Sequence, residues 1–361
     1  MLFHFFTSLI EQYSFLNVFK YLTFRTGLSV ITSLIVVFII GAPLIKVFSE
    51  KMITGPIRQD GPIDHIVKKS GTPTMGGVII IIGIIAGTLL WSDLTNIYVW
   101  VLIFVSLSLG SLGLLDDVLK IKHKNSSGLK SKYKFSGQLI IGAITMFLLI
   151  YYSDHEYLFD LYFPFFKNFI WHMGLFFIPF GVLVIIGASN AVNLTDGLDG
   201  LATVPVMLVA LSFTLISYIV GNTIFSEYLQ IQYIPDVGEL AIFCGSLVGA
   251  CLGFLWYNAP PAKIFMGDTG SLSLGGSLAA VAIIVKHEIV LAIIGGLFVL
   301  ETVSVIIQVL SFKLTGKRIF KMAPIHHHFE KKGWAESTIV IRFWIIAIIL
   351  ALVGLATLKL R

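Results

Sequence analysis

The chain of 361 residues is 57% hydrophobic and only 12% charged, whereas soluble domains carry about 25% charged residues. This composition excludes a soluble globular protein and is typical of an integral membrane protein. The net charge of +5 does not indicate a nucleic-acid partner, because the basic residues do not cluster on a soluble domain. The two cysteines, Cys244 and Cys251, lie within one apolar run, so we expect no disulfide or cysteine-based metal framework.

Apolar runs long enough to cross a bilayer recur along the whole chain. A hydrocarbon core of about 30 Å requires roughly 20 helical residues. The predicted spans are 24–45, 74–92, 97–115, 135–152, 171–190, 200–220, 238–257, 270–285, 289–310 and 338–358. The eighth is the weakest, because glycine and serine interrupt its start. We therefore predict an all-α, polytopic membrane protein of about ten transmembrane helices, forming one domain over residues 1–361.

The distribution of lysine and arginine predicts the orientation. Alternate loops at 46–73, 116–134, 191–199, 258–269 and 311–337 contain 18 of the 25 basic residues. Because positively charged loops remain inside, these loops are predicted to be cytoplasmic. An even number of spans then places both termini outside. Every unusual motif in the chain falls on this cytoplasmic set, which is defined by lysine and arginine alone.

The first motif, GTPTMGG at 71–77, opens the second span directly after Lys68 and Lys69. A helix N-terminus near a lysine suits a phosphate group. Proline, threonine and glycine are also ordinary residues of a helix start. This motif alone therefore does not decide between phosphate binding and capping.

Asp116 and Asp117 end the third span and precede a loop with six lysines. Adjacent carboxylates at membrane depth are costly unless they are paired or metal-bound. Successive helical residues point about 100° apart, so we do not expect the two to grip one atom from the same side. We expect one to meet a metal or substrate while a lysine holds the other. The structural alternative is a pair of interfacial acids neutralised by the lysines.

Residues 190–200 join the fifth and sixth spans. If this segment is helical, Asn190, Asn193, Asp196 and Asp199 step by three and share one face. The loop contains no lysine or arginine, although it lies on the basic cytoplasmic side. Uncompensated acids indicate a bound cation or polar substrate groups. A turn rich in asparagine and aspartate is the structural alternative.

The most informative motif lies at 258–271, where Asp268 follows Gly267 in the run FMGDTGS. A carboxylate between glycines allows backbone and ligand to approach closely. Thr269 and Ser271 are expected to cap the next helix, whose N-terminus favours anions. Because Mg²⁺ usually takes one or two carboxylates together with phosphate oxygens, Asp268 is the predicted metal ligand. A glycine turn with a capping aspartate is the alternative.

Three consecutive histidines, His326, His327 and His328, stand in the last long loop. A zinc site is not favoured, because three successive side chains cannot all face one ion on a regular element. The two-histidine spacing of helical zinc sites is also absent from the sequence. The expected role of these histidines is hydrogen bonding to phosphate or acid–base catalysis.

Together these motifs resemble those of the polyprenyl-phosphate N-acetylhexosamine-1-phosphate transferases, and within that superfamily the phospho-N-acetylmuramoyl-pentapeptide transferases. The residues that carry the resemblance are Asp116-Asp117, NLTDGLDG at 193–200, FMGDTGS at 265–271 and PIHHHFE at 324–330. The resemblance extends from Thr23-Phe24-Arg25 through 58–62 and 71–77 to 356–359, and so covers essentially the whole chain. Val118 and Pro260 depart from the family pattern, which puts local geometry in doubt and leaves the reaction unaffected.

The resemblance implies a reaction. Phospho-N-acetylmuramoyl-pentapeptide moves from its UDP carrier to undecaprenyl phosphate, giving lipid I and UMP, with Mg²⁺ as cofactor. The implied partners are UDP-N-acetylmuramoyl-pentapeptide and undecaprenyl phosphate, a membrane lipid. The implied location is the bacterial cytoplasmic membrane. The sequence leaves open the oligomeric state, for which a homodimer is one alternative, and the choice between direct attack and a covalent phospho-intermediate.

The resemblance also implies residue roles, position by position. Asp268 is similar to the metal ligand of the family, and Asp116, Asp117 and His326 to its catalytic groups. The implied substrate contacts are Lys69, Thr74, Lys132, Asn193, Asp196, Asp199, Asn258, Phe265, His327 and His328. Among these, Phe265 is placed to stack on the uracil.

Two other functions are compatible with parts of the pattern. A transporter also carries intramembrane acids, but usually in mid-span and in repeated halves, whereas the acids here cluster at one set of span ends. A related transferase that uses UDP-N-acetylglucosamine shares the aspartate motifs and is the closer rival.

Overall fold

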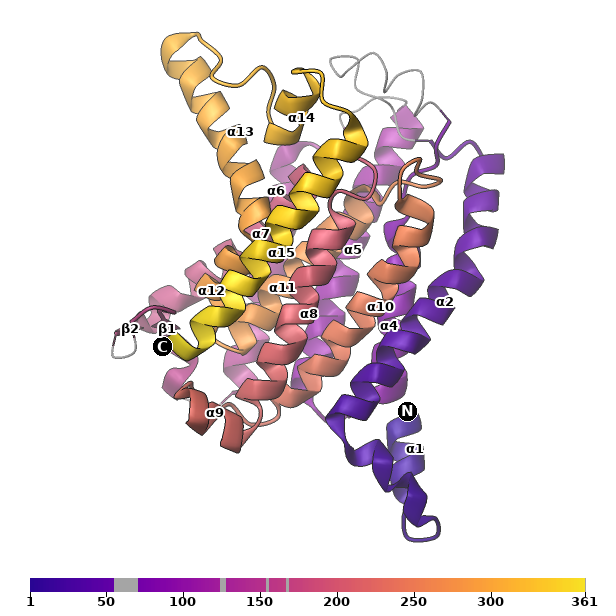
Figure 1. Ribbon diagram of the computed structural model, residues 1–361, viewed down its shortest axis with the longest axis vertical. Coiled ribbons are helices and arrows are strands. Elements are labelled where there is room, and N and C mark those ends of the chain that lie inside the picture. Colours follow the sequence, from indigo (N-terminus) through magenta and orange to yellow (C-terminus); the bar gives the residue numbers. More distant parts are fainter. Residues whose placement is uncertain (55–70, 124–127, 154–155, 167–168, 361) are drawn as a thin grey trace.

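The computed structural model describes residues 1–54, 71–123, 128–153, 156–166 and 169–360, and these are dominated by long helices (Figure 1). The long helices are α2 (Leu22–Glu50), α4 (Gly77–Trp91), α5 (Ile97–His123), α6 (Ser131–Tyr152), α7 (Phe177–Thr195), α8 (Thr203–Val220), α10 (Leu240–Asn258), α11 (Gly267–Ile284), α13 (Gly296–Thr315) and α15 (Glu336–Leu360). The short elements are α1 (Leu2–Ser8), α9 (Thr223–Leu229), α12 (Glu288–Ile294), α14 (Ile325–Glu330), β1 (Asp160–Tyr162) and β2 (Ile170–His172).

Nine helices of the described chain are long and apolar enough to cross a membrane. A tenth, α4, is equally apolar but has only 15 residues. The all-α, polytopic prediction is therefore confirmed. Two predicted spans differ most. The run 289–310 is divided at Gly295 into α12 and α13, and α13 continues to Thr315. The run 171–190 becomes α7, which begins only at Phe177 and continues to Thr195.

The centre of the bundle is formed by α10 and α11. The buried share of the apolar stretch is 83% in α10 and 89% in α11, compared with 22% in α2 and α13. α11 packs against α5 and α7, while α10 packs against α2, α4 and α8. Helix α13 leans away from the bundle at the end that carries α14 (Figure 1). Since α2 and α13 bury so little, most of their apolar surface is left to the lipid.

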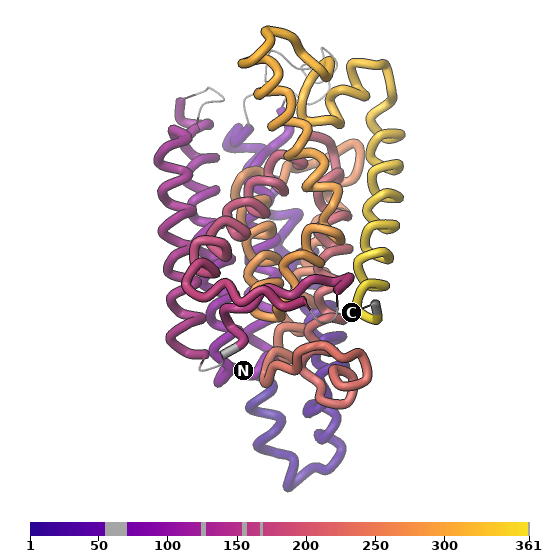
Figure 2. Tube along the Cα trace, turned by 90° about the vertical axis from the view of Figure 1, so that its left-hand side faces the viewer, coloured from indigo at the N-terminus to yellow at the C-terminus, as the bar shows by residue number. Residues whose placement is uncertain are grey.

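Both termini lie toward the end of the bundle opposite α14, in the view of Figure 1 and after a turn of 90° in Figure 2. This arrangement agrees with an even number of passes through the bundle. The loop between α6 and α7 adds an antiparallel hairpin in which Asp160 of β1 lies opposite His172 of β2. The hairpin is an element that the apolar pattern does not predict.

Candidate active site

Two glycine-bearing motifs, far apart in the sequence, lie side by side. The backbone nitrogens of Gly76 and Gly77 donate to the carbonyls of Phe265 and Met266 at 2.9 and 2.8 Å. In the other direction, the nitrogen of Phe265 donates to the carbonyl of Pro73 at 2.9 Å. These bonds tie the turn at residues 73–76 to residues 265–266, and Met75 in this turn has a positive φ of 70°, so α4 begins only at Gly77. The start of α4 is thereby fixed against the start of α11.

Glycine is required where α4 and α5 meet α11. A Cβ atom on Gly77 would lie 2.0 Å from the backbone nitrogen of Gly270, and one on Gly113 would lie 2.2 Å from the carbonyl oxygen of Asp268. Any side chain at either position would therefore collide with backbone. The close approach at Gly113 of α5 brings Asp116 and Asp117, one turn further along, to Asp268.

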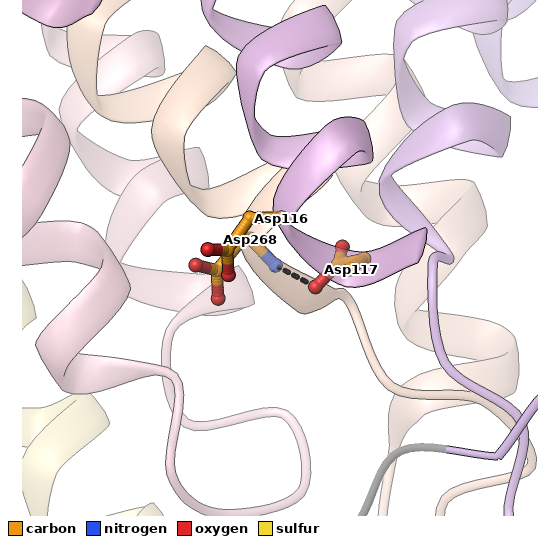
Figure 3. A group of neighbouring side chains, drawn as sticks. All are labelled: Asp116, Asp117 and Asp268. Carbon is orange, nitrogen blue, oxygen red and sulfur yellow. Dashed lines mark hydrogen bonds between the residues drawn. The ribbon is translucent and has the colours of Figure 1, made fainter. Parts of the chain in front are cut away.

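The three aspartates form one acidic cluster (Figure 3). Each offers a carboxylate oxygen within 4.8 Å of the others, and Asp116 and Asp117 are buried. Two lysines neutralise them. Lys120 Nζ lies 2.6 Å from an oxygen of Asp116 and 2.9 Å from one of Asp268, and Lys134 forms a second ion pair with Asp268. A cluster of carboxylates that attracts two ammonium groups is suited to a divalent cation, whose preferred ligands are such oxygens.

Asp117 caps helix α11 from a neighbouring helix. Its oxygens accept hydrogen bonds from the backbone nitrogens of Asp268 and Thr269, at 3.2 and 3.0 Å, and from Thr269 Oγ1 at 2.8 Å. The first N–H groups of a helix have no partner within it, and a negative charge there is favourable. Asp117 therefore fixes the backbone that carries Asp268.

The expectation that Thr269 and Ser271 cap α11 is wrong. Helix α11 begins at Gly267, so both hydroxyl residues lie inside its first turns. Thr269 donates to Asp117, and Ser271 Oγ donates to the carbonyl of Gly267 at 3.0 Å. The cap comes instead from α5, a tertiary contact that local capping rules do not include.

The divergence expected for Asp116 and Asp117 is present. Asp116 turns its carboxylate to the same place as Asp268, whereas Asp117 lies apart and bonds the backbone (Figure 3). Asp116 is the member paired with a lysine, Lys120, and its other oxygen accepts from the nitrogen of Leu129 at 2.8 Å. Asp117 is held mainly by helix amides, with Lys120 at 3.7 Å.

The segment 190–200 is helical only in its first half. Helix α7 ends at Thr195, so Asn190 and Asn193 share a helical face but Asp196 and Asp199 lie beyond it. The Asn193 amide donates to Ser271 Oγ at 2.9 Å, which ties α7 to α11. The carboxylate of Asp199, which is buried, accepts from the nitrogen of Ala262 at 2.9 Å.

Asn258 is buried at the end of α10, where its side chain connects three backbone segments. The amide oxygen accepts from the nitrogen of Gly200 at 3.1 Å and from Thr203 Oγ1 at 2.9 Å. The amide nitrogen donates to the carbonyl of Ile264 at 2.9 Å. Asn258 thus joins the 190–200 segment to the stretch that leads into Phe265, a half-buried residue.

The three histidines make three different contacts. His326 is fully buried and pairs through Nδ1 with Glu301 at 3.0 Å. His327 Nδ1 pairs with Glu330 at 2.6 Å, and His328 Nδ1 accepts from the nitrogen of Lys321 at 3.0 Å. Partial burial, together with the positive charges of Lys332 and Lys321, lowers the pKa of His328. The separate contacts agree with the prediction that the three rings do not face one ion.

The other predicted contacts are spread over the same end of the bundle. Thr74 is buried, and its Oγ1 lies 3.1 Å from the point where a Cβ on Gly267 would sit. Lys132 is exposed, while Lys134, two residues later, reaches Asp268. Lys69 lies outside the described residues.

Comparison with known proteins supplies the family. A family model described as glycosyl transferase family 4 matches residues 99–286, and a phospho-N-acetylmuramoyl-pentapeptide-transferase signature matches residues 69–81. The chain is 67% identical to the phospho-N-acetylmuramoyl-pentapeptide-transferase of Pelagibacter ubique (strain HTCC1062), over 100% of both chains. It is 53% identical to the protein of that name from Maricaulis maris (strain MCS10), again over 100% of both.

The chain belongs to the phospho-N-acetylmuramoyl-pentapeptide-transferase family. This result answers both rival interpretations, the transporter and the UDP-N-acetylglucosamine branch. The matched signature covers the whole of the 71–77 motif, and the model for glycosyl transferase family 4 includes all three aspartates of the acidic cluster.

Sequence reasoning missed three charged residues at this candidate site. The lysines of 116–134 were expected to pair with Asp116 or Asp117, but no lysine was singled out, and the pairing of Lys120 and Lys134 with Asp268 was not predicted. The spacing of Lys120 four residues after Asp116 was an available signal, because such residues are neighbours on a helix. Glu301 is a lone acid in an apolar span, which is itself a signal of function.

Proposed function

We propose that this protein transfers phospho-N-acetylmuramoyl-pentapeptide from UDP to undecaprenyl phosphate, forming lipid I and UMP in peptidoglycan synthesis. The observation that carries the proposal is the acidic cluster of Asp116, Asp117 and Asp268 at one end of an apolar helical bundle. One substrate is a lipid and the other a charged nucleotide, so their reaction requires a polar site at a membrane surface. The full-length relatives carry the name of this activity.

The acidic cluster is our proposed magnesium site. Asp268 and Asp116 face the same place and would hold the ion, while Asp117 remains bonded to the start of α11. When bound, magnesium would neutralise charge on the phosphoryl group, and in such transfers positioning and neutralisation supply most of the catalysis. Lys120 and Lys134 lie at the same point and would face the phosphate oxygens of the donor.

The predicted site residues divide into four proposed roles. Asp116 would orient the phosphate of the lipid acceptor. Asn193, Asp196 and Phe265 would line the nucleotide site, with Phe265 on the uracil. Asp199 and Asn258 would act by bracing, since they bond the backbones of Ala262 and Ile264 on the way to Phe265. Thr74 and Lys69 would complete the phosphate side.

We further propose that this site faces the cytoplasm of the bacterial inner membrane, with both termini outside and one domain over the whole chain. Support comes from the lysine and arginine bias and from the position of both termini opposite α14 (Figure 1). A cytoplasmic site is also where a nucleotide donor is available. A homodimer is compatible with this arrangement.

The histidine segment is proposed to select the donor. Residues 311–337 carry six lysines and arginines beside His326, His327 and His328. A muramoyl donor bears a peptide ending in carboxylates, which a basic, histidine-rich segment can hold, whereas plain UDP-N-acetylglucosamine offers nothing there. Changing the histidines singly is therefore expected to weaken the preference for the peptide-bearing donor.

The test supplies purified enzyme with undecaprenyl phosphate and either radiolabelled donor, and measures label in an organic phase. Strong preference for the muramoyl donor is the expected result. Equal or better use of UDP-N-acetylglucosamine would refute the proposed choice of donor. If the histidine variants lost stability but kept the preference, the segment would only be a structural brace.

A further inference from the structure

Glu301 is a buried carboxylate in a helix that is mostly exposed on the outside of the bundle. Only 22% of the apolar stretch of α13 is buried, yet the side chain of Glu301 is fully buried. An acid inside a membrane span is costly and is expected to have a partner or a function. Glu301, on the inward side of α13, is therefore expected to have such a partner or function.

Both oxygens of Glu301 are used by the first turn of α14. Oε2 accepts from the backbone nitrogen of Ile325 at 2.8 Å, and Oε1 pairs with His326 Nδ1 at 3.0 Å. A carboxylate accepts and does not donate, so the proton of this bond lies on Nδ1. The bond made by one ring nitrogen determines what the other can do. Glu301 thus leaves Nε2 of His326 for a separate partner.

Nε2 of His326 lies against Gly197 in the segment 190–200. A Cβ atom on Gly197 would lie 2.3 Å from it. The nitrogen is buried and has no hydrogen-bond partner among the residues that the structure describes. Buried polar groups are nearly always bonded. A partner from the substrate, arriving over Gly197, would satisfy this nitrogen.

We propose that Glu301 is a positioning residue for the transfer reaction. It holds His326 so that Nε2 meets a polar group of the nucleotide donor at Gly197. The inference deepens the proposed function and rests on it. The competing explanation is that Glu301 only anchors α14 to α13, in which case its contribution would be to stability alone.

A double-mutant cycle separates the two explanations. Glu301→Gln keeps the shape, but one amide cannot accept from both Nδ1 and the nitrogen of Ile325. We expect a loss in kcat/KM of about tenfold or more for Glu301→Gln and for His326→Ala. If Glu301 acts through His326, adding Glu301→Gln to His326→Ala should cost less than about twofold more, because residues that act as a unit are not additive.

A second cycle uses the close contact at Gly197. Gly197→Ala should displace the ring of His326 and lower kcat/KM by about tenfold, since the added Cβ falls on Nε2. In the His326→Ala background the same change should have little effect, because the obstructing nitrogen is gone. This cycle leaves Glu301 intact, so it remains informative even if Glu301→Gln does not fold.

The control is Thr302→Val, an isosteric change at the next residue of α13, whose hydroxyl donates to the carbonyl of Phe298 in its own helix. It should keep wild-type kcat/KM. Additive losses in both cycles would overturn the proposal, as would Glu301→Gln with a lowered melting temperature and unchanged kcat/KM. Failure of the wild-type enzyme to use the muramoyl donor would instead refute the proposed function, and the same assay shows which has failed.

Discussion

Replacing Asp117 by asparagine tests whether this residue acts by capping α11. The carboxylate accepts from the nitrogens of Asp268 and Thr269 and from Thr269 Oγ1. An asparagine has one acceptor oxygen. Placed to keep both bonds from Thr269, it would turn its NH₂ group toward the nitrogen of Asp268, and two donors would face each other.

The magnitude follows from these contacts. Leaving one buried N–H without an acceptor costs about 1–3 kcal/mol. Removing a negative charge from a helix N-terminus costs about 0.3–2 kcal/mol more, depending on burial. Asp117→Asn should therefore destabilise the start of α11 by about 1–5 kcal/mol. Thr269→Val removes only the hydroxyl bond, about 1 kcal/mol, and gives an internal scale.

The assay is the apparent melting temperature in detergent, measured beside turnover and magnesium activation. We expect the melting temperature to decrease from wild type through Thr269→Val to Asp117→Asn. Turnover should fall in the same order, because Asp268 moves with the helix start. A wild-type melting temperature with turnover abolished would show that Asp117 acts in the reaction itself. Wild-type values for both would show that the cap contributes nothing.

Three further outcomes are expected. Asp268→Asn should remove nearly all turnover without preventing folding or membrane insertion. A tenfold loss of rate corresponds to about 1.4 kcal/mol in the activation barrier. If the variant kept more than about a tenth of the wild-type rate, the metal would be held elsewhere. Single cysteines introduced at Ser127 and Ser337 should react with an impermeant thiol reagent only after the cells are opened to expose the inner face of the membrane. Ser127 lies outside the described residues. Labelling of either cysteine in intact cells would show that the predicted orientation in the membrane is wrong. Gly77→Ala should lower both melting temperature and turnover, because its Cβ meets the backbone of α11, whereas Gly27→Ala, with open space around it, should not; equal effects of the two would contradict the packing argument.

The helices were predictable because lipid imposes a long, nearly uniform apolar run on each span. Where the pattern gave the wrong boundary, tertiary contacts decided. Helix α4 starts at Gly77 because residues 73–76 pair with residues 265–266. Gly295 divides one apolar run into α12 and α13, a break that hydropathy does not register because glycine interrupts several other spans without dividing them.

The residues of the candidate site were largely predictable from the motifs, but their contacts with one another were not. Asp116, Asp117 and Asp268 were identified from their residue types, and the structure brings them together. The division of labour between them was not predictable, because it depends on α5 reaching the end of α11. The contact of Lys134 was not predictable either. Lys134 lies in the first turn of α6 and pairs with Asp268, whereas Lys132 in the same turn remains exposed.

The cap on α11 has a consequence for how the protein is made. Asp117 and the backbone nitrogen that it binds are 151 residues apart, so α5 enters the membrane well before its partner has been synthesised. During that interval Lys120, on the same helix, is the neutralising charge within reach of both aspartates. Lys120 thus allows α5 to insert without two uncompensated carboxylates. When α11 arrives, Asp268 becomes the third carboxylate near Lys120. The acidic cluster is consequently completed only when α11 arrives, and a chain truncated before α11 would carry Asp116 and Asp117 without Asp268 and the backbone nitrogens that bind Asp117.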